Sequence, residues 1–185
     1  VAETRRILTL LEQVEQFGNL KPIAPKPLNI HDVIDRARRS AQLGFSAHIN
    51  FKEDYDPSLP LVYGDPDQLL QVFLNLIKNA SEAQPNNGNI KLRTYFEHSF
   101  KLRRADGSGH SMPIQVEVTD NGPGVSEDIR DEIFDPFVSG RNNGTGLGLA
   151  LTSKIISDHK GLISLDSKPG NTVFRISLPF VTKLN

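Results

Sequence analysis

The spacing of hydrophobic residues predicts alternating helices and strands from about residue 30 to residue 178. Helices are expected where apolar residues recur every three or four positions, and strands where apolar and polar residues alternate. The expected helices are 30–43, 66–83, a short helix after Ser126, and a last helix that the glycine-rich segment 140–148 opens and that ends near His159. The expected strands are 47–53, 89–97, 114–120, 162–167 and 172–178. This order predicts one mixed α/β unit.

The helix expected over 66–83 has the clearest start signal. Asp65 is placed to cap this helix, Pro66 suits its first turn, and Gln68 is placed for a capping-box contact. One face of the helix is apolar and is expected to be buried. The residues of that face are Leu69, Phe73, Leu76 and Ala80.

Residues 1–18 form a further predicted helix, which ends at Gly18-Asn19. Its apolar residues, at spacings of four, three and three, are Ile7, Leu11, Val14 and Phe17. This stripe has no partner within its own segment. It therefore packs either on the domain that follows or on another helix of a longer coiled hairpin.

The stretch KPIAPKPLN separates this helix from the α/β unit. Its three prolines break any helix, so we expect a short, stiff linker. The expected division is the end of a helix at 1–20, a proline-rich linker at 21–28 and one domain at 29–185. The chain begins with Val1 rather than Met, so we expect it to be a piece of a longer protein.

Composition and charge narrow the possible functions. The 185 residues are 37% hydrophobic and include 14 glycines, which is typical of a soluble globular protein. A formal net charge of −1 gives no general attraction to nucleic acid or to an anionic membrane, so we expect neither as a partner. The absence of cysteine excludes disulfides, thiolate metal sites and cysteine nucleophiles, and no apolar run is long enough to span a membrane. Any polyanion must therefore be bound at a local site.

Three segments carry residues suited to chemistry, and the first is a polar stripe on the helix after Asp65. Asn75, Asn79 and Glu82 are spaced four and three apart, so they share one helix face. The stripe is either a solvated face or a source of neutral amide oxygens for Mg²⁺, which binds few protein ligands and completes its shell with water and phosphate.

The second segment is Asp120-Asn121-Gly122-Pro123-Gly124, at the end of an expected strand. Glycine and proline suit a turn for backbone reasons alone. The alternative is a binding site, because a carboxylate at the tip of a buried strand can accept a hydrogen bond from an adenine amino group. The glycines would let a flat ring lie against the backbone.

The third segment, Gly144-Thr145-Gly146-Leu147-Gly148-Leu149, opens a predicted helix. Free backbone N–H groups and the positive end of the helix dipole suit a phosphate. A dinucleotide-binding fold is excluded because DPFVSGRNN, and not a strand, precedes the glycines. A P-loop is excluded because no glycine in the chain is followed by lysine.

Together and in this order, the three segments resemble the N, G1, F and G2 boxes of the GHKL ATP-binding superfamily, and most specifically the catalytic domain of bacterial sensor histidine kinases. The matching segments are DQLLQVFLNLIKNASEA, DNGPG, Phe134-Asp135-Pro136-Phe137 and GTGLGLA, with GNTVFRISLP as a closing strand. The resemblance runs from about His31 to Pro179 and is greatest to kinases of nitrogen regulation. It implies a two-layer α/β sandwich, in which helices cover one face of a mixed sheet.

The resemblance implies a role for each motif residue. Asn79 would coordinate Mg²⁺ at the phosphates of ATP, and Asn75 would be the second catalytic residue, near the γ-phosphate. Asp120 would accept from the adenine amino group, backed through water by Thr172. The other nucleotide-binding residues would be Gly122, Gly124, Gly144, Thr145, Gly146, Leu147 and Gly148.

The resemblance also implies a lid, here residues 138–145, over the phosphates. Arg141 and Lys78 either meet the phosphates or are solvated surface charges. Phe134 and Phe137 are expected to seat the lid on the core. Glu82 departs from the basic or aromatic residue that many sensor kinases carry at its position, which leaves its role open.

The phosphoacceptor histidine of such kinases lies on a helix, beside an acidic residue and upstream of the N box. None of the five histidines here has that setting, and His31-Asp32 follows the linker at a helix start. We therefore expect the acceptor on a hairpin upstream of this chain, with residues 1–20 as the end of its second helix. The intact protein would be a cytoplasmic homodimer formed through this dimerisation and phosphotransfer domain.

The implied reaction is transfer of the γ-phosphoryl group of MgATP to that histidine, for relay to a response-regulator receiver domain in nitrogen regulation. One alternative is an ATPase of the gyrase, MutL or Hsp90 kind. Those enzymes activate water with a Glu one helical turn before the metal-binding Asn, where this chain has Asn75, so transfer is favoured. The other alternative is a nucleotide-sensing docking module, against which the intact motifs argue.

Overall fold

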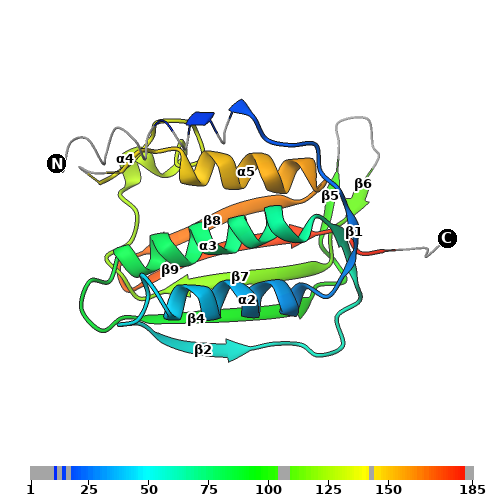
Figure 1. Ribbon diagram of the computed structural model, residues 1–185, viewed down its shortest axis with the longest axis horizontal. Coiled ribbons are helices and arrows are strands. Elements are labelled where there is room, and N and C mark those ends of the chain that lie inside the picture. Colours follow the sequence, from blue (N-terminus) through cyan, green and yellow to red (C-terminus); the bar gives the residue numbers. More distant parts are fainter. Residues whose placement is uncertain (1–10, 12–13, 16–17, 104–108, 142–143, 182–185) are drawn as a thin grey trace.

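The computed structural model describes residues 11, 14–15, 18–103, 109–141 and 144–181 (Figure 1). Its strands are β1 (Lys26–Leu28), β2 (Asn50–Asp54), β3 (Val62–Gly64), β4 (Asn89–Phe96), β5 (Lys101–Arg103), β6 (Gly109–Ser111), β7 (Ile114–Asp120), β8 (Leu162–Lys168) and β9 (Asn171–Leu178). Its helices are α2 (Ile30–Gln42), α3 (Pro66–Glu82), α4 (Glu127–Arg130) and α5 (Gly148–Asp158). All the helices and strands expected between residues 30 and 178 are therefore present, although β2 begins three residues later than expected.

The main sheet has five strands in the order β2-β4-β7-β9-β8. β2 and β4 are parallel, and the other neighbouring strands are antiparallel, so the sheet is mixed. Figure 1 shows α2, α3 and α5 lying side by side over one face of this sheet. The predicted fold class, a mixed sheet covered on one face by helices, is confirmed.

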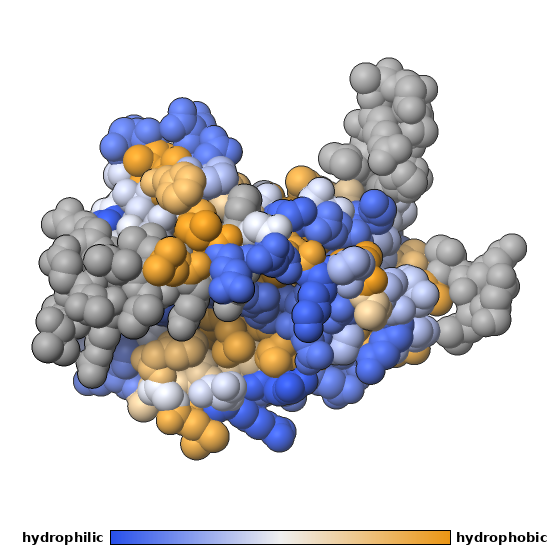
Figure 2. Space-filling view, turned by 45° about the horizontal axis from the view of Figure 1, so that its top comes forward, coloured by the Kyte–Doolittle hydropathy of each residue, from blue (hydrophilic) through white to orange (hydrophobic). Residues whose placement is uncertain are grey.

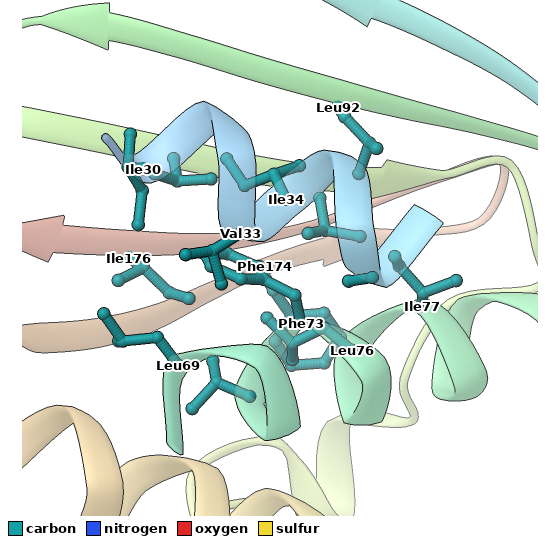
Figure 3. Close-up of a cluster of buried hydrophobic side chains, with 14 of the residues drawn as sticks. Ile30, Val33, Ile34, Leu69, Phe73, Leu76, Ile77, Leu92, Phe174 and Ile176 are labelled. Atoms are coloured by element: carbon teal, nitrogen blue, oxygen red, sulfur yellow. The ribbon is translucent and has the colours of Figure 1, made fainter. Parts of the chain in front are cut away.

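The hydrophobic core lies between these helices and the sheet. Figure 3 shows apolar side chains of α2 and α3 meeting those of β4 and β9. The predicted apolar face of α3 is confirmed, because Leu69, Phe73, Leu76 and Ala80 are at most 1% exposed. Packing of these two helices therefore fixes which face of α3 remains available for polar residues.

The start of α3 follows the predicted cap but not the predicted capping box. The Asp65 carboxylate accepts hydrogen bonds from the N–H groups of Asp67 and Gln68, at 3.0 and 3.2 Å. The Gln68 side chain does not return to the cap. It donates instead to the backbone carbonyl of Lys21 at 2.9 Å, so the capping-box prediction was wrong because a linker carbonyl takes this amide.

Four short strands, β1, β3, β5 and β6, were not among the expected strands, and β1 lies in the expected linker. β1 pairs antiparallel with β3, so that Leu28 faces Val62 and becomes buried. The N–H of Ala24 donates to the Asp65 carboxylate at 3.0 Å. The last residues of the 21–28 stretch are thus attached to the α/β unit, and the division of the chain at 20 and 28 stays a prediction.

Other expectations fall partly outside the described residues. Of the stripe on residues 1–18, Leu11 and Val14 are 60% and 47% exposed, and Ile7 and Phe17 are not among the residues described. β5 and β6 pair antiparallel, and residues 104–108 between them lie outside the description. Within the described part of the chain, no helix combines the length and the apolar character needed to cross a membrane.

Candidate functional site

A cavity of about 560 Å³ lies between α3, the loop after β7, the glycine-rich segment before α5 and the first residues of β9. Its lining brings together residues from all three motifs. The predicted site residues in the lining are Asn75, Asn79, Asp120, Gly124, Arg141, Gly144, Thr145, Gly146, Gly148 and Thr172. On the side of the molecule that carries α5, apolar residues form several groups among hydrophilic ones (Figure 2).

Two predicted residues do not line this cavity. Gly122 is buried beside Asp120, where a side chain would come within 2.8 Å of the Asp120 carboxylate and 3.1 Å of Ala83. The side chain of Leu147 is buried, and its N–H donates to the Thr145 hydroxyl at 3.4 Å. Both residues therefore shape the walls of the cavity without contributing surface to it.

Asp120 contributes a buried carboxylate to the cavity lining. It is the last residue of β7 and is only 4% exposed, and its carboxylate accepts a hydrogen bond from the Gly122 N–H at 2.8 Å. Burial raises the pKa of this carboxyl group, and the Gly122 hydrogen bond and the charge of Arg141 oppose that shift. One acceptor oxygen of Asp120 thus has a protein partner, and the remaining acceptor capacity is available to a ligand.

The loop after β7 is fastened to the β8–β9 hairpin, a connection the sequence analysis missed. Gly124 has a φ of +88°, and an added side chain would meet the Lys168 carbonyl carbon at 3.1 Å. The N–H of Gly170 donates to the Gly122 carbonyl at 2.8 Å. The glycine at 124 is therefore required both by its conformation and by the close approach of the hairpin.

The first turn of α5 forms another part of the cavity wall. α2 and α3 have side-chain caps from Asn29 and Asp65, whereas α5 has no side-chain cap. Gly148 and Leu149, at the start of α5, both line the cavity. Uncapped N–H groups at the positive end of a helix dipole suit an anion.

The amide of Asn75 connects α3 to this helix start. Its Nδ2 donates to the Gly148 carbonyl at 3.3 Å. Asn75 therefore faces the same end of the cavity as the uncapped turn. Asn79 lies one turn further along α3 and also lines the cavity, so the two amides predicted to share a helix face do so.

The base of the lid depends on Gly146. Its φ is +69°, its carbonyl accepts from the Phe137 N–H at 3.0 Å, and an added Cβ would lie 2.4 Å from the Phe137 carbonyl carbon. The two ends of the lid are thus in backbone contact, and only glycine fits at 146. Residues 142 and 143 of the lid lie outside the described residues.

The two phenylalanines of the F box behave differently. Phe134 packs against the core, with its ring edge-on to that of Phe174 at a centroid distance of 6.3 Å, as expected. Phe137 is 69% exposed and has a φ of +68°. The expectation that Phe137 seats the lid on the core was wrong, because its backbone turns to pair with Gly146 and its ring is left in solvent.

Arg141 joins the lid to α3. Its guanidinium donates to the Asn79 backbone carbonyl at 2.7 Å and is ion-paired with Glu82. Lys78, also in the lining, lies 3.9 Å from Glu82. Glu82, whose role the sequence left open, is therefore the acidic centre of a small charge cluster at the cavity mouth.

Three of the five histidines are held in other contacts. Nε2 of His31 lies 2.8 Å from the Thr94 hydroxyl, and Nε2 of His48 lies 3.0 Å from the Gln84 carbonyl. The expectation that His48 lies in a strand was wrong, since it sits in the turn before β2. Nε2 of His159 accepts from the Asp65 N–H at 2.9 Å. No group of three or more acidic or histidine side chains suited to a metal occurs among the described residues.

Comparison with known proteins identifies the class. Residues 64–182 match the family model described as Histidine kinase-, DNA gyrase B-, and HSP90-like ATPase. The chain therefore belongs to this family, and its resemblance to GHKL ATP-binding domains is confirmed.

Among the proteins most similar in sequence to this chain are several named sensory histidine kinase/phosphatase NtrB. The chain is 64% identical to the one from Rhodobacter capsulatus over 99% of its own length, and 48% identical to the one from Azospirillum brasilense over 96%. It covers 52% and 45% of those two proteins, so it spans about half the length of these relatives.

Solved structures agree with this fold. The mycobacterial sensor histidine kinase MprB is 26% identical, with a TM-score of 0.69 over 84% of this chain and 97% of that one. The catalytic domain of histidine kinase ThkA is 28% identical, with a TM-score of 0.69 over 84% and 95%. The domain architecture is thus that of histidine kinase catalytic domains.

Proposed function

We propose that this chain is the ATP-binding catalytic domain of a two-component sensor histidine kinase that acts in nitrogen regulation. One observation carries the proposal. A single cavity is lined by a buried carboxylate, Asp120, by an uncapped helix start and by two asparagines, Asn75 and Asn79. This arrangement suits a molecule with a hydrogen-bonding ring at one end and a charged phosphate chain at the other.

The residues of the cavity fit MgATP. Asp120, backed through water by Thr172, would accept from the adenine amino group, while Gly144, Gly146, Gly148 and the uncapped N–H groups of α5 would bind phosphates. The side-chain carbonyl of Asn79 is a hard, neutral oxygen, the type of ligand that suits Mg²⁺. The metal would neutralise phosphate charge, and the protein would supply position.

The acidic residues of the cavity argue for phosphoryl transfer rather than ATP hydrolysis, because neither of them is free to activate water. Among the described lining residues, the only acidic side chains are Glu82 and Asp120. Glu82 is ion-paired with Arg141, and the Asp120 carboxylate accepts from the Gly122 N–H. Asn75, at the position where the related ATPases carry their Glu, uses its amide to bind the Gly148 carbonyl. Under this proposal Asp120 faces the adenine and Glu82 is held by Arg141, so neither carboxylate would act as a general base for water.

The acceptor would be a histidine on an upstream dimerisation and phosphotransfer domain. Residues 1–20 would be the end of that domain, 21–28 the linker and 29–185 the catalytic domain. The intact protein would be a cytoplasmic homodimer that passes the phosphoryl group to an aspartate of a response-regulator receiver domain. The names of the relatives from Rhodobacter capsulatus and Azospirillum brasilense support this assignment.

The first test is nucleotide binding and turnover by the chain alone. Calorimetric titration with ATP, ADP and GTP, with Mg²⁺ and with EDTA, should show Mg²⁺-dependent binding of ATP and a strong preference for adenine. Release of inorganic phosphate should stay near the uncatalysed rate. Equal affinity for GTP would refute the role of Asp120, and rapid steady phosphate release would favour the ATPase alternative.

A further inference from the structure

Three polar side chains form a row across the end of the sheet beside the cavity. Asp120 on β7 is the Cα partner of Thr172 on β9, and Thr172 is in turn the Cα partner of Ser167 on β8. All three residues are buried, with exposed fractions of 4%, 4% and 6%. Asp120 and Thr172 line the cavity, whereas Ser167 does not.

The hydroxyl group of Ser167 has two hydrogen-bond partners. The Val125 N–H donates to its Oγ at 2.9 Å, and Oγ1 of Thr172 lies 3.3 Å away. A backbone N–H can only donate, so Ser167 is the acceptor in the first bond. Within the described residues, Oγ1 of Thr172 is the one acceptor in reach of the Ser167 hydroxyl hydrogen.

The direction of the second bond follows from burial. If Thr172 donated to Ser167, the hydrogen of Ser167 would be buried without an acceptor, which is costly. Ser167 therefore donates to Thr172. The hydroxyl hydrogen of Thr172 is then not used by Ser167. The neighbouring Asp120 carboxylate does not take it either, because the partner described for that carboxylate is the Gly122 N–H. This hydrogen is therefore available to a group in the cavity.

We propose that Ser167 is a positioning residue that fixes Thr172 as a hydrogen-bond donor and thereby contributes to selection of adenine. The inference rests on the proposed ATP site and adds to it a residue outside the cavity. The chain of bonds runs from the Val125 N–H through Ser167 to Thr172 and ends at the ligand. It also couples the loop after β7 to the β8–β9 hairpin.

The resulting pattern matches adenine and opposes guanine. Adenine presents an amino donor next to the acceptor N1, and Asp120 as acceptor beside Thr172 as donor is complementary to that pair. A water between Thr172 and N1 would preserve the match. Guanine presents a carbonyl and an N–H at the same two places, so both contacts would be lost and two buried groups left unpaired.

The test uses analogues that report each contact separately. 1-Deaza-ATP lacks the ring N1 acceptor, and purine riboside triphosphate lacks the amino group. Ser167→Ala should weaken the binding of ATP and of purine riboside triphosphate by about three- to tenfold. It should weaken the binding of 1-deaza-ATP by less than about twofold. Ser164→Ala, an exposed serine on the same strand, is the matched control and should change none of the three.

A second variant separates positioning from simple damage to the loop. Thr172→Val removes the donor itself, so it should give the same pattern as Ser167→Ala, and the double variant should lose no further discrimination between ATP and 1-deaza-ATP. A Ser167→Ala variant that weakens all three analogues equally, or none, would overturn the proposal. So would a parent chain that binds 1-deaza-ATP as well as ATP. A parent that binds no adenine nucleotide would instead refute the proposed function.

Discussion

Arg141 and Asn79 are joined across the mouth of the cavity, where the guanidinium of Arg141 donates to the backbone carbonyl of Asn79 at 2.7 Å. Arg141 belongs to the lid, and Asn79 is the residue proposed to bind Mg²⁺. Glu82, one turn beyond Asn79, holds the same guanidinium in an ion pair. The lid arginine is therefore placed beside the residue proposed to bind Mg²⁺.

Removing the charge of Glu82 should tighten ATP binding. Glu82 competes with phosphate for Arg141 and adds negative charge near the triphosphate, so Glu82→Gln should lower the Kd for MgATP by up to about fivefold. Arg141→Ala should raise it. Glu132→Gln, an exposed acid outside the cavity lining, is the control. Calorimetry at low and high salt checks the prediction, and weaker binding by Glu82→Gln would contradict it.

Replacing Asp120 should stabilise the empty domain while removing function. Burial raises the pKa of Asp120 in the folded state, so its carboxylate opposes folding increasingly as pH rises from about the unfolded value of 3.8 through the raised pKa. Asp120→Asn should therefore raise Tm at pH 7 by about 2–4 °C, and the gain should vanish below about pH 4.

The same variant should bind ATP more weakly, because an amide that keeps the Gly122 hydrogen bond turns a donor toward the adenine amino group. Thermal unfolding across this pH range, with exposed Asp166→Asn as control, tests the stability claim. An Asp120→Asn variant that is destabilised at pH 7 and unchanged in ATP affinity would contradict both parts.

Asn79→Ala should abolish Mg²⁺-dependent ATP binding without unfolding the protein. Alanine offers no metal ligand, yet it favours helix more than asparagine does, so Tm should stay equal or rise slightly. Asn86→Ala, at an exposed turn outside the cavity, should leave binding unchanged. Titration with and without EDTA is the measurement. Parental affinity in Asn79→Ala would show that the metal is held elsewhere.

Gly146→Ala should open the base of the lid. Its Cβ would collide with the Phe137 backbone, whereas Gly170 has a similar φ of +81° but open space around it. Gly170→Ala should therefore cost only conformational strain, about 1 kcal/mol, and keep ATP binding. Gly146→Ala should lower the free energy of unfolding by more than this and weaken ATP binding tenfold or more. Denaturant unfolding measures the first effect and calorimetric titration the second. Equal effects at both positions would mean that the contact with Phe137 is unimportant.

Short sequence patterns predicted correctly those features that depend only on residues close together in the chain. Asp65-Pro66 and the apolar spacing of α3 predicted the start and buried face of that helix, because capping and amphipathicity depend on neighbours within one or two turns. The residues of the three motifs were gathered into one cavity as expected. Their order along the chain predicted this through resemblance rather than through any single spacing.

The features that sequence analysis missed depend on residues distant along the chain. The pairing of β1 with β3, the ion pair of Glu82 with Arg141, and the contact of Ser167 with Val125 join residues that are at least 34 positions apart. Phe137 was misplaced for a related reason, since its positive φ follows from backbone contact with Gly146. For Ser167 one signal was available in the sequence. Side chains alternate between the two faces of a strand, which places Ser167 of β8 on the same face as the apolar Ile163.

The central claim is that this chain transfers a phosphoryl group to a histidine outside itself. The chain should be mixed with γ-labelled ATP, Mg²⁺ and the part of the Rhodobacter capsulatus NtrB relative that it does not cover. Acid-labile, alkali-stable label should appear on that partner, at a rate that rises with partner concentration and is abolished by Asn79→Ala. Without the partner, the chain should acquire almost no label. Robust labelling of the chain alone, especially at His31, or release of all the label as inorganic phosphate, would contradict the account.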